Sequence, residues 1–564
     1  MTGESMIMLV TFAAVLIIAA VVMIRDKRRQ REWFLAKVHR LWGSVADREY
    51  TTEELDSISH YAKKHQKERF MVDDITWNDL NMDQIFMVMN TTVSSCGEDV
   101  LYRMLRLPEF DEEVLKERNR QIEYFRTHEN ERIQVQTQVK EVRKISALSL
   151  SDYIYALKDV ERAGSGKYIF LAILSLISIG LVFINPLAGI LALVVVISIN
   201  AIIHSRDSKK IEPYLNCIVC IIRMLKAADG FEKIENPQIQ SYLERIRRGN
   251  KSMKNFRKGS FLVASASAMQ DGLEAFVISY LKIIFMVDFI KFYSMLRNVD
   301  GHEKEIEDMF EAMGELDALI AVASFREFLP FWCEPALTPQ KDASEQIQLK
   351  VQNMYHPMIS NPVANSITID KGVLITGSNA SGKSTFLKTA ALNAILAQTV
   401  YTCTAQEYSS NYLQVMTSMA LRDDLESGES YYMVEIKSLQ RILKECEKKK
   451  PILCIVDEVL RGTNTIERIA ASSRILKSLS MPHVLPLAAT HDIELSYILE
   501  DCYDNYHFEE EIRDHDVFFN YQLKDGRATT RNAIKLLEII GYDPQIVKDA
   551  QEAAREFEET GVWK

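Results

Sequence analysis

The chain has 564 residues, of which 47% are hydrophobic, and its formal net charge is −11. This length can bury several separate cores, so we expect more than one domain. The negative charge argues against a protein that coats nucleic acid along its whole surface, although a local basic patch can still bind phosphates. The eight cysteines are scattered among apolar or helical contexts, which is typical of reduced cytosolic thiols.

The first 24 residues contain an apolar stretch, residues 6–24, that is interrupted only by Thr11. At ~1.5 Å per residue this stretch can cross a bilayer core of roughly 30 Å. No Lys or Arg precedes it, unlike in a cleaved signal peptide. Basic residues follow it at once, namely Arg25, Lys27, Arg28, Arg29 and Arg31. We therefore predict a transmembrane helix over residues 1–24, with the N-terminus outside and the following chain inside.

Residues 25–72 are predicted to form juxtamembrane helices, and residues 73–167 a mainly helical segment. In the first of these, apolar side chains recur at helical spacing opposite basic ones: Trp33, Phe34, Val38, Leu41 and Trp42. This pattern fits a helix lying on the membrane surface and an ordinary packed helix equally well.

A second apolar region covers residues 168–203 and is interrupted at Asn185-Pro186. It is too long for one span but suits two helices of ~17 residues joined by a tight turn, so we predict a membrane hairpin. Lys167 before it and Arg206 after it place both ends on the cytoplasmic side. The resulting expectation is a multi-pass cell-membrane protein, and the alternative is a helical pair buried in a soluble core.

Residues 204–345 are expected to form a helical lever region. It includes a dense basic run, made of Arg245, Arg247, Arg248, Lys251, Lys254, Arg257 and Lys258. This run is the best local candidate for contact with phosphates, either of nucleic acid or of lipid headgroups. A solvated helix face is the commoner explanation for such a run.

From about residue 346 to residue 564 strand-like and helix-like patterns alternate, which predicts a parallel sheet covered by helices. Within it an apolar run, residues 372–376, leads into a glycine loop and then into a helical pattern. The loop consists of Gly377, Ser378, Asn379, Ala380, Ser381, Gly382, Lys383, Ser384 and Thr385. Strand, glycine loop and helix in this order form a cradle for nucleotide phosphates, so we predict ATP binding here.

Polar side chains in and after this loop have complementary chemistry. Lys383 would neutralise the β- and γ-phosphates, and the Ser384 hydroxyl would hold Mg²⁺. Asp457 and Glu458 end an apolar run, and we assign Asp457 to the metal and Glu458 to the attacking water. His491 ends another such run and is a candidate sensor of the γ-phosphate, the alternative being a capping histidine.

Ser430 opens a helical pattern between the loop and Asp457. A serine at a helix start offers a hydroxyl and N–H groups to an anion. Because the loop already encloses the phosphates of its own chain, we expect Ser430 to act on the nucleotide of a second copy. This implies a homodimer with two shared ATP sites.

These motifs resemble those of the MutS family of DNA mismatch-repair ATPases. Residues 376–385 resemble the TGPNMGGKST loop, residues 430–435 the STFMVEM signature, and residues 453–463 the LLLDEIGRGT motif. Ala489-Thr-His491 is similar to the ATH switch, and Glu315 to Ala323 is similar to the lever helix. The resemblance implies an α/β P-loop ATPase domain of ABC/MutS type that binds ATP and Mg²⁺. Together with the apolar runs, the predicted fold is an α-helical membrane and lever region followed by this domain.

Three positions depart from the family pattern: Ser378 replaces the loop proline, Leu460 replaces the first glycine of GRGT, and Tyr431-Tyr432 replaces Thr-Phe. None of them removes a charged or metal-binding group. We expect no mismatch-reading domain, because Phe325-Arg-Glu327 is the stretch that fits its Phe-x-Glu wedge and it falls in the predicted lever helix.

The leading hypothesis is a membrane-anchored, dimeric MutS-like ATPase that couples ATP hydrolysis to lever movement and acts on DNA. A membrane-remodelling or transport-coupled ATPase of the wider ABC group, without a DNA role, is the alternative. A third reading is a tether that uses ATP only to dimerise, but the presence of Glu458 argues against it.

Overall fold

A computed structural model describes most of the chain. The described residues are 3–46, 48–66, 69–144, 157, 165–254, 256–257, 280–342, 344–378, 381–419, 431–461, 463–513, 516–528 and 533–561. The chain divides into two compact units that do not follow chain order. Unit 1 comprises Met1–Lys63, Met87–Leu101 and Gln121–Phe328, and unit 2 comprises Lys64–Phe86, Tyr102–Arg120 and Leu329–Lys564.

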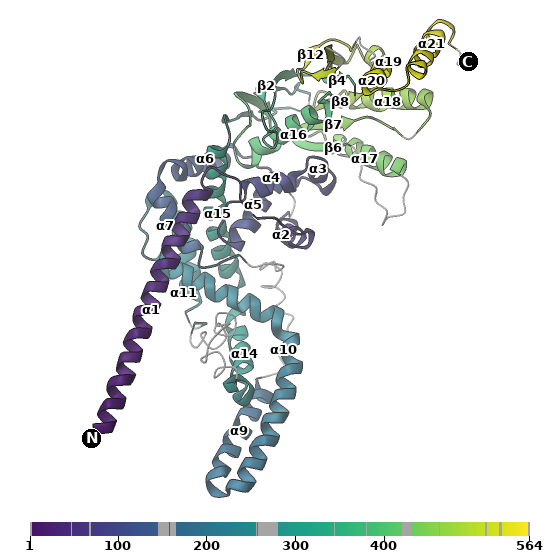
Figure 1. Cartoon of the computed structure of the whole chain (residues 1–564). Helices are drawn as coiled ribbons and strands as arrows, with labels where there is room; N and C mark the ends of the chain where they lie inside the picture. Colours follow the sequence, from purple (N-terminus) through teal and green to yellow (C-terminus); the bar gives the residue numbers. More distant parts are fainter. Residues whose placement is uncertain are drawn as a thin grey trace. The chain divides into compact units, whose positions relative to one another are not determined.

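The described part of unit 1 is helical (Figure 1). Its helices are α1 (Gly3–Leu41), α2 (Thr52–Lys64), α7 (Glu129–Val139), α9 (Gly166–Ile184), α10 (Pro186–Phe231), the short η1 (Pro237–Ile239), α11 (Gln240–Ser252), α14 (Val287–Val299) and α15 (Glu303–Phe328). The division between the units passes through α4 (Met82–Met89), α5 (Ser95–Arg106) and α6 (Glu112–Thr127). The single segment predicted for residues 73–167 is therefore shared between two units.

Helix α1 joins the predicted first span to the predicted juxtamembrane helix without a break. In its second half Phe34 and Val38 are buried, and Lys140 Nζ of unit 1 lies 4.2 Å from the Phe34 ring centroid. This part of α1 is thus packed against the rest of unit 1. Of the two interpretations left open by the sequence, this favours the ordinary packed helix. The membrane role of residues 6–24 remains a prediction.

The apolar hairpin is present as α9 and the first part of α10, which lie side by side (Figure 1). Asn185 separates them and caps α10, because its side chain accepts a hydrogen bond from Ala188 N and Pro186 occupies the first helical turn. By length and composition, Gly166–Ile184 and Pro186–Ile211 could each cross a membrane. Many of their large apolar side chains are exposed, including Phe183, Leu187 and Leu191.

The membrane hairpin was predicted over residues 168–203, and its second helix extends beyond this stretch. Helix α10 continues to Phe231, so the boundary expected between residues 203 and 204 lies inside it. Helix α10 packs against α7 and α11, and its later part buries apolar side chains that include Ile218, Ile221 and Leu225, which stabilises the continuation of the helix. One helix therefore belongs both to the hairpin and to the lever region.

The chain has a helix break at Met286, next to the hairpin. Polar side chains from both helices of the hairpin donate hydrogen bonds to the backbone at this break. Met286 has a positive φ of 49° and separates α14 from the helical residues before it. The carbonyl of Ile284 accepts hydrogen bonds from Ser175 Oγ of α9 at 2.7 Å and Asn200 Nδ2 of α10 at 2.9 Å. These bonds replace the helical partner that the break removes.

The core of unit 1 is built around α15, which is buried along most of its length. Asp317 of this helix is fully buried and accepts hydrogen bonds from Val93 N, Ser94 N and Ser94 Oγ. Burial raises the pKa of Asp317 to about 6, although these donors favour the carboxylate. A Cβ atom on Gly97 would lie 2.2 Å from Asp317 Oδ2, so this close approach requires glycine.

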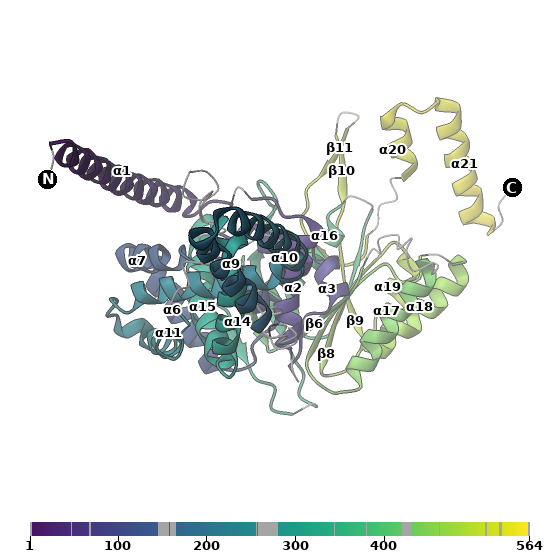
Figure 2. The same cartoon turned by 90° about the horizontal axis from the view of Figure 1, so that it is seen from below.

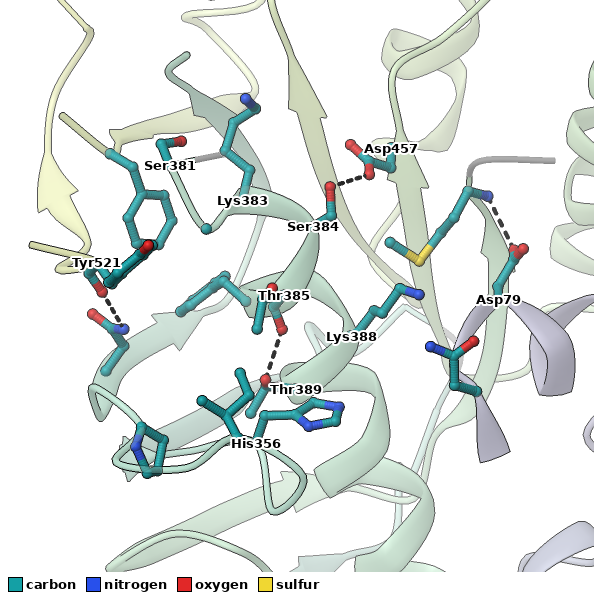
Figure 3. Close-up of a pocket in the computed structure, with 18 of the residues that line it drawn as sticks. Asp79, His356, Ser381, Lys383, Ser384, Thr385, Lys388, Thr389, Asp457 and Tyr521 are labelled. Atoms are coloured by element: carbon teal, nitrogen blue, oxygen red, sulfur yellow. Dashed lines mark hydrogen bonds between the residues drawn. The ribbon is translucent and has the colours of Figure 1, made fainter. Parts of the chain in front are cut away.

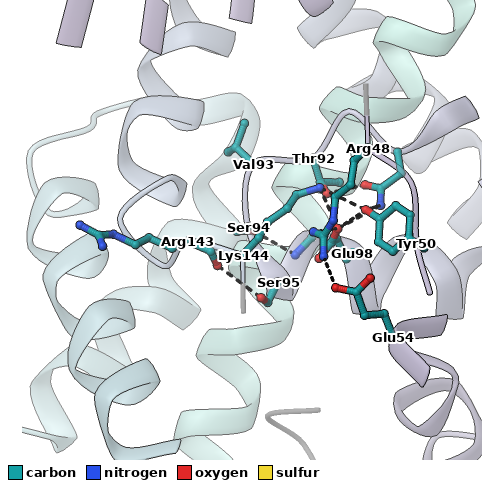
Figure 4. Close-up of polar contacts among 12 residues, drawn as sticks. Arg48, Tyr50, Glu54, Thr92, Val93, Ser94, Ser95, Glu98, Arg143 and Lys144 are labelled. Atoms are coloured by element: carbon teal, nitrogen blue, oxygen red, sulfur yellow. Dashed lines mark hydrogen bonds and ion pairs between the residues drawn. The ribbon is translucent and has the colours of Figure 1, made fainter. Parts of the chain in front are cut away.

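A second polar cluster of unit 1 surrounds Glu98 (Figure 4). Its carboxylate pairs with Arg48 Nη1 at 3.0 Å and with Lys144 Nζ at 2.7 Å, and it accepts a hydrogen bond from Tyr50. Arg48 also pairs with Glu54 at 3.0 Å. A buried carboxylate with several donors is well satisfied, so this cluster fixes the segments that meet there.

Unit 2 includes two segments from the first 120 residues, and its last segment begins at Leu329 rather than near residue 346. Helix α3 (Asp74–Asp79) packs against strand β6 (Gln414–Ser418). Asp79 Oδ2 accepts hydrogen bonds from Thr417 Oγ1 at 2.6 Å and Met419 N at 3.0 Å. These contacts explain why distant segments fold into one unit.

The main sheet of unit 2 has six strands in the order β12-β9-β4-β8-β7-β6. Five of them are parallel and β12 is antiparallel at one edge. The strands are β4 (Gly372–Thr376), β6, β7 (Ile452–Asp457), β8 (Val484–Thr490), β9 (Tyr503–His507) and β12 (Lys524–Asp525). This confirms the parallel sheet predicted for the last third of the chain.

Two smaller sheets accompany the main one. A four-stranded sheet has the order β1-β5-β2-β3, with β1 (Ala336–Thr338), β2 (Leu349–Met354), β3 (Asn365–Ile369) and β5 (Glu407–Asn411). An antiparallel pair is formed by β10 (Glu510–Arg513) and β11 (Asp516–Phe519).

Helices cover the main sheet and leave the carboxyl ends of its strands next to the glycine loop. Helix α16 (Lys383–Thr399) contacts β6, β7 and β8. Helices α17 (Tyr431–Cys446), α18 (Thr465–Leu479) and α19 (Ile493–Ile498) share one apolar cluster with the strands, and Figure 2 shows α17 and α18 together beside them. The last helices are α20 (Ala533–Ile540) and α21 (Pro544–Thr560). Since β4, β7 and β8 are parallel, their carboxyl ends meet at one edge, where the predicted site residues lie.

Candidate nucleotide-binding site

A cleft of about 1020 Å³ opens at this edge of the sheet (Figure 3). It is lined by the loop between β4 and α16, by the end of β7 and its following turn, and by segments around residues 354–365. Its volume is at the upper end of the range of small-molecule sites, which suits a ligand of nucleotide size. All of its lining residues belong to unit 2.

Two glycines give the loop a shape that other residues would strain. Gly377 has a φ of 148° and Gly382 a φ of 106°. A Cβ atom on Gly377 would also lie 2.6 Å from the carbonyl oxygen of Phe508. The tight turn therefore depends on glycine at both positions, and it brings the N-terminal end of α16 to the cleft.

Lys383 lies inside the loop rather than in solvent. Its Nζ donates to the carbonyl oxygens of Gly377 at 2.8 Å and Ser378 at 2.7 Å. Burial lowers the pKa of Lys383, and the nearby charges of Glu458 and Asp457 partly offset this. The ammonium group is thus held at the phosphate-binding surface, where a polyphosphate could replace the carbonyl contacts.

Ser384 and Asp457 meet as the metal assignment requires. Ser384 Oγ donates to Asp457 Oδ2 at 2.6 Å (Figure 3). Asp457 Oδ1 is buried, and it has no hydrogen-bond partner among the described residues. A hydroxyl and a carboxylate are oxygen ligands that Mg²⁺ prefers, so this pair fits the ion. Ser381 Oγ is a second buried group without a partner in the described part of the chain, and it lies in the same loop.

Glu458 lies between His491 and Arg461 at the turn after β7. Its Oε1 lies 2.8 Å from His491 Nε2, and its Oε2 lies 2.5 Å from Arg461 Nε. Burial alone would raise the pKa of Glu458, but the hydrogen bond from His491 and the charges of His491, Arg461 and Lys383 lower it below the usual value. Glu458 is therefore a carboxylate at neutral pH. Its φ of 55° is in the left-handed region and holds it away from the strand direction.

His491 connects the acidic and basic sides of the site. Besides the contact with Glu458, its Nε2 lies 3.5 Å from Lys383 Nζ. A histidine that can exchange partners between a carboxylate and a phosphate is placed as a sensor would be. The structure thus brings Lys383, Ser384, Asp457, Glu458 and His491 together from three separate motifs.

The rest of the cleft wall was not predicted from the sequence. Tyr521 comes from the segment after β11 and lies next to the loop, and His356 and Lys388 line another part of the wall (Figure 3). Pro362 and Val363 add apolar surface. Flat aromatic and apolar groups beside a phosphate loop suit the base of a nucleotide. The one sequence signal was His356-Pro357, which is similar to the family's entry into the ATPase domain.

Several predicted residues lie outside the site or outside the described residues. Asn379, Ala380, Ser430 and Lys258 are not among the described residues. The basic run belongs to unit 1, and it is not a single helix face, because α11 ends at Ser252. Within the run, Arg245 pairs with three acidic residues of α15, namely Asp308 at 2.6 Å, Glu311 at 2.9 Å and Glu315 at 3.0 Å.

Other members of the run are also engaged within unit 1. Arg247 donates to the carbonyl oxygen of Ile234, and Arg257 pairs with Asp229 at 2.6 Å. Arg248, Lys251 and Lys254 are exposed. The surface available for phosphate contact is therefore smaller than the sequence indicated.

Comparison with known proteins places this site in a family. Residues 373–558 match the family model for MutS domain V. The DNA mismatch repair protein MutS of Methanosarcina barkeri is 28% identical over 286 residues, which are 48% of this chain and 31% of the relative. The human MutS protein homolog 4 is 34% identical over 223 residues, 36% of this chain and 24% of the relative.

A bacterial relative shows a similar degree of likeness. The DNA mismatch repair protein MutS of Thermus thermophilus is 29% identical over 209 residues, 36% of this chain and 26% of the relative. Residues 373–558 of the chain are thus similar to MutS domain V. The chain spans only about a quarter to a third of the length of these curated relatives.

One departure from the MutS motif is visible in the backbone. Leu460, which replaces the first glycine of GRGT, has a φ of 59°, a conformation that favours glycine. Its N–H donates to Glu435 Oε1, and its side chain is buried in the apolar cluster of α17 and α18. This burial and hydrogen bond offset the strain, so the turn keeps its shape without the glycine.

Proposed function

We propose that this protein binds ATP with Mg²⁺ in the cleft of unit 2 and hydrolyses it. The observation that carries the proposal is the 2.6 Å contact between Ser384 of the loop and Asp457 of β7, with Lys383 beside it. A magnesium ion held by Ser384 and Asp457 would bridge phosphate oxygens and neutralise their charge. Loop N–H groups and Lys383 would hold the remaining oxygens.

Glu458 and His491 supply the hydrolytic part of the proposal. A carboxylate that is ionised at neutral pH can accept a hydrogen bond from a water molecule and orient it toward the γ-phosphate. His491, 2.8 Å from Glu458, can hold this carboxylate or contact the γ-phosphate. The positions of both residues are set by neighbouring parallel strands, β7 and β8.

The first test is ATP turnover by the full chain, purified in an uncharged detergent. Asp457→Asn should lower Mg²⁺-dependent turnover by about 100-fold or more, because it removes the charge at the metal position. Asp504→Asn is the matched control, since Asp504 lies in strand β9 of the same sheet and pairs with the exposed Lys371. Equal turnover by wild type and Asp457→Asn would remove the metal assignment.

We further propose that the protein is a homodimer anchored in the cell membrane, with its N-terminus outside and unit 2 in the cytoplasm. Residues 6–24 and the two apolar stretches of α9 and α10 would be the spans. Continuity of α10 from the hairpin to Phe231 supports a mechanical connection between the membrane and the lever region. Ser430 would complete the ATP site of the second copy. Protease accessibility in sealed vesicles tests the topology, and cleavage of unit 2 from outside would contradict it.

A DNA transaction is the activity that the relatives suggest, since two of those compared are named DNA mismatch repair proteins. We propose that this protein acts on DNA through unit 1. Fluorescence anisotropy with duplex, branched and mismatched DNA at stated salt tests this. Charge reversal of the exposed Arg248, Lys251 and Lys254 should weaken binding and reduce its salt dependence. No binding at low salt would exclude the DNA role.

The exposed apolar hairpin favours a second candidate, an ATPase that remodels the membrane or is coupled to transport, without DNA. Stimulation of ATP turnover by liposomes, with no effect of DNA, would favour it over the DNA role.

A further inference from the structure

Unit 1 contains a second cleft, of about 1230 Å³. It lies along the part of α1 that follows the predicted span. The second half of α1 forms one wall, and the segments around residues 90–93 and 136–144 form the other. Ten basic and two acidic side chains line it. This excess of positive charge contrasts with the net charge of −11 of the whole chain.

Part of this positive charge is not paired within the protein. Arg48 and Lys144 pair with Glu98, and Lys226 pairs with Glu141 at 2.7 Å. For Arg31, Lys140 and Arg143, in contrast, no carboxylate lies within ion-pair distance in the described part of the chain. Burial lowers the pKa of Lys140, and the charges of Arg31 and Lys226 lower it further, although Glu141 opposes them. Three basic side chains of the cleft are thus not neutralised by carboxylates of the described residues.

The cleft also offers groups other than cations. Gln136 is only 5% exposed, and its Oε1 has no hydrogen-bond partner among the described residues. It can accept a hydrogen bond from a ligand hydroxyl. Trp33, Phe34 and Trp42 provide aromatic surface, and Lys140 Nζ lies 4.2 Å from the Phe34 ring centroid. A ligand with phosphate and hydroxyl groups matches this lining.

The position along α1 indicates where such a ligand comes from. Lys27, Arg29 and Arg31 follow Ile24, the last residue of the predicted span, by three to seven residues. At ~1.5 Å per residue they lie about 5–10 Å beyond the hydrocarbon core, at the depth of lipid headgroups. From there the cleft continues to Lys140 and Arg143. Its mouth would therefore face headgroup phosphates.

We propose that this cleft binds the phosphate-bearing headgroup of an anionic lipid from the cytoplasmic leaflet. The proposal rests on the membrane anchoring proposed above. It assigns Lys140, Arg143 and Arg31 to the phosphate and Gln136 to a headgroup hydroxyl. Occupation of the cleft would join α1 to the core of unit 1 and so make the packing of this helix depend on the lipid.

The test measures lipid-dependent thermal stability of the full chain in uncharged detergent, since a ligand that binds the folded state raises Tm. Phosphatidylglycerol and cardiolipin are titrated against phosphatidylcholine, and inorganic pyrophosphate and duplex DNA are separate competitors. Lys140→Gln/Arg143→Gln should raise the concentration of anionic lipid that gives half of the increase in Tm by about 10- to 30-fold. Lys233→Gln/Lys304→Gln is the control, because it removes the same charge from exposed positions of the same unit outside the cleft.

Each outcome decides the proposal. An equal effect of phosphatidylcholine, or equal losses in the two double variants, would overturn it in favour of general surface charge. Pyrophosphate that displaces the lipid at equal concentration would make a soluble phosphate the ligand, and duplex DNA that alone stabilises the protein would make nucleic acid the ligand. If Lys140→Gln impairs folding, Arg143→Gln alone, at an exposed position, still reports on the cleft.

Failure of the wider functional proposal is distinguishable. ATP turnover is measured on the same samples, and an inactive ATPase with intact lipid dependence would leave the cleft assignment in place. A chain that proves soluble without detergent would remove the membrane source.

Discussion

Ser378 occupies the loop position that is proline in the MutS motif, and its hydroxyl donates to Glu510 Oε2 at 2.5 Å. Proline would restrict φ, whereas here a hydrogen bond to the buried Glu510 holds the loop. The same carboxylate contributes favourable charge near Lys383. A polar contact therefore stands at the position where the motif has a covalent restriction.

His356 is a residue whose titration should be visible in the stability of unit 2. Burial, together with the charge of Lys388, lowers the pKa of His356 to about 4. Between about pH 6.5 and 4 the unfolded chain therefore binds the proton more readily than the folded chain, so this residue lowers stability as pH falls. We expect His356→Gln to lose less Tm than wild type between pH 7 and pH 5. The exposed His60→Gln is the control, and identical losses in all three proteins would contradict the assignment.

The residues of the nucleotide site divide into predictable and unpredictable ones. Lys383, Asp457 and His491 were predictable, because each of them ends or follows an apolar run. A polar side chain in such a place can be recognised from the neighbouring sequence alone. Tyr521 and Asp79 line the same cleft but come from segments without a motif. Their positions follow from the packing of α3 on β6 and from the path of the chain after β11, which no local pattern contains.

Among the elements, the hairpin depends on a polar connection between its helices and the backbone near α14. Ser175→Ala removes a hydrogen bond to Ile284 O and the acceptor of Asn200 Nδ2. We expect the free energy of unfolding in detergent to fall by about 0.5–1.5 kcal/mol. Ser198→Ala is the matched control, since the Ser198 hydroxyl donates to Val194 O of its own helix, at 2.8 Å. Equal effects of the two substitutions would show that the connection is not stabilising.

Element types were more predictable than their ends. The apolar runs at residues 6–24 and 168–203 predicted helices, and the alternating pattern after residue 346 predicted the parallel sheet. The length of α10 was not predicted, because its later part is stabilised by burying Ile218, Ile221 and Leu225 in tertiary contacts. The basic run was interpreted as one stripe because charge density in sequence does not show that Arg245 faces three carboxylates of α15.

At the scale of the whole molecule, the two compact units are interleaved in sequence, and contacts between distant segments decide their membership. Arg441, for example, pairs with Asp73 of unit 2, although 368 positions separate them. Such pairing explains why domain boundaries drawn in chain order do not coincide with the units. A substitution in residues 64–86 can therefore affect the candidate nucleotide-binding cleft directly, since Asp79 lines it.

The proposed homodimer makes a prediction that no single copy can satisfy. Lys383→Ala and Ser430→Ala should each inactivate both sites of a homodimer. In a heterodimer purified through two different tags, one site retains both Lys383 and the Ser430 of the other copy, so about half of the wild-type turnover should return. A heterodimer as inactive as either homodimer would contradict a site shared in this way.

Comparison of wild type with Glu458→Gln shows whether Glu458 orients the attacking water in the ATP hydrolysis proposed for unit 2. The substitution keeps the size of the side chain and removes its charge. We predict that ATP binding is retained while turnover falls by about 100-fold or more. Glu500→Gln, which alters an exposed ion pair with Arg527 in the same unit, should leave turnover unchanged. Equal turnover by wild type and Glu458→Gln would contradict the account.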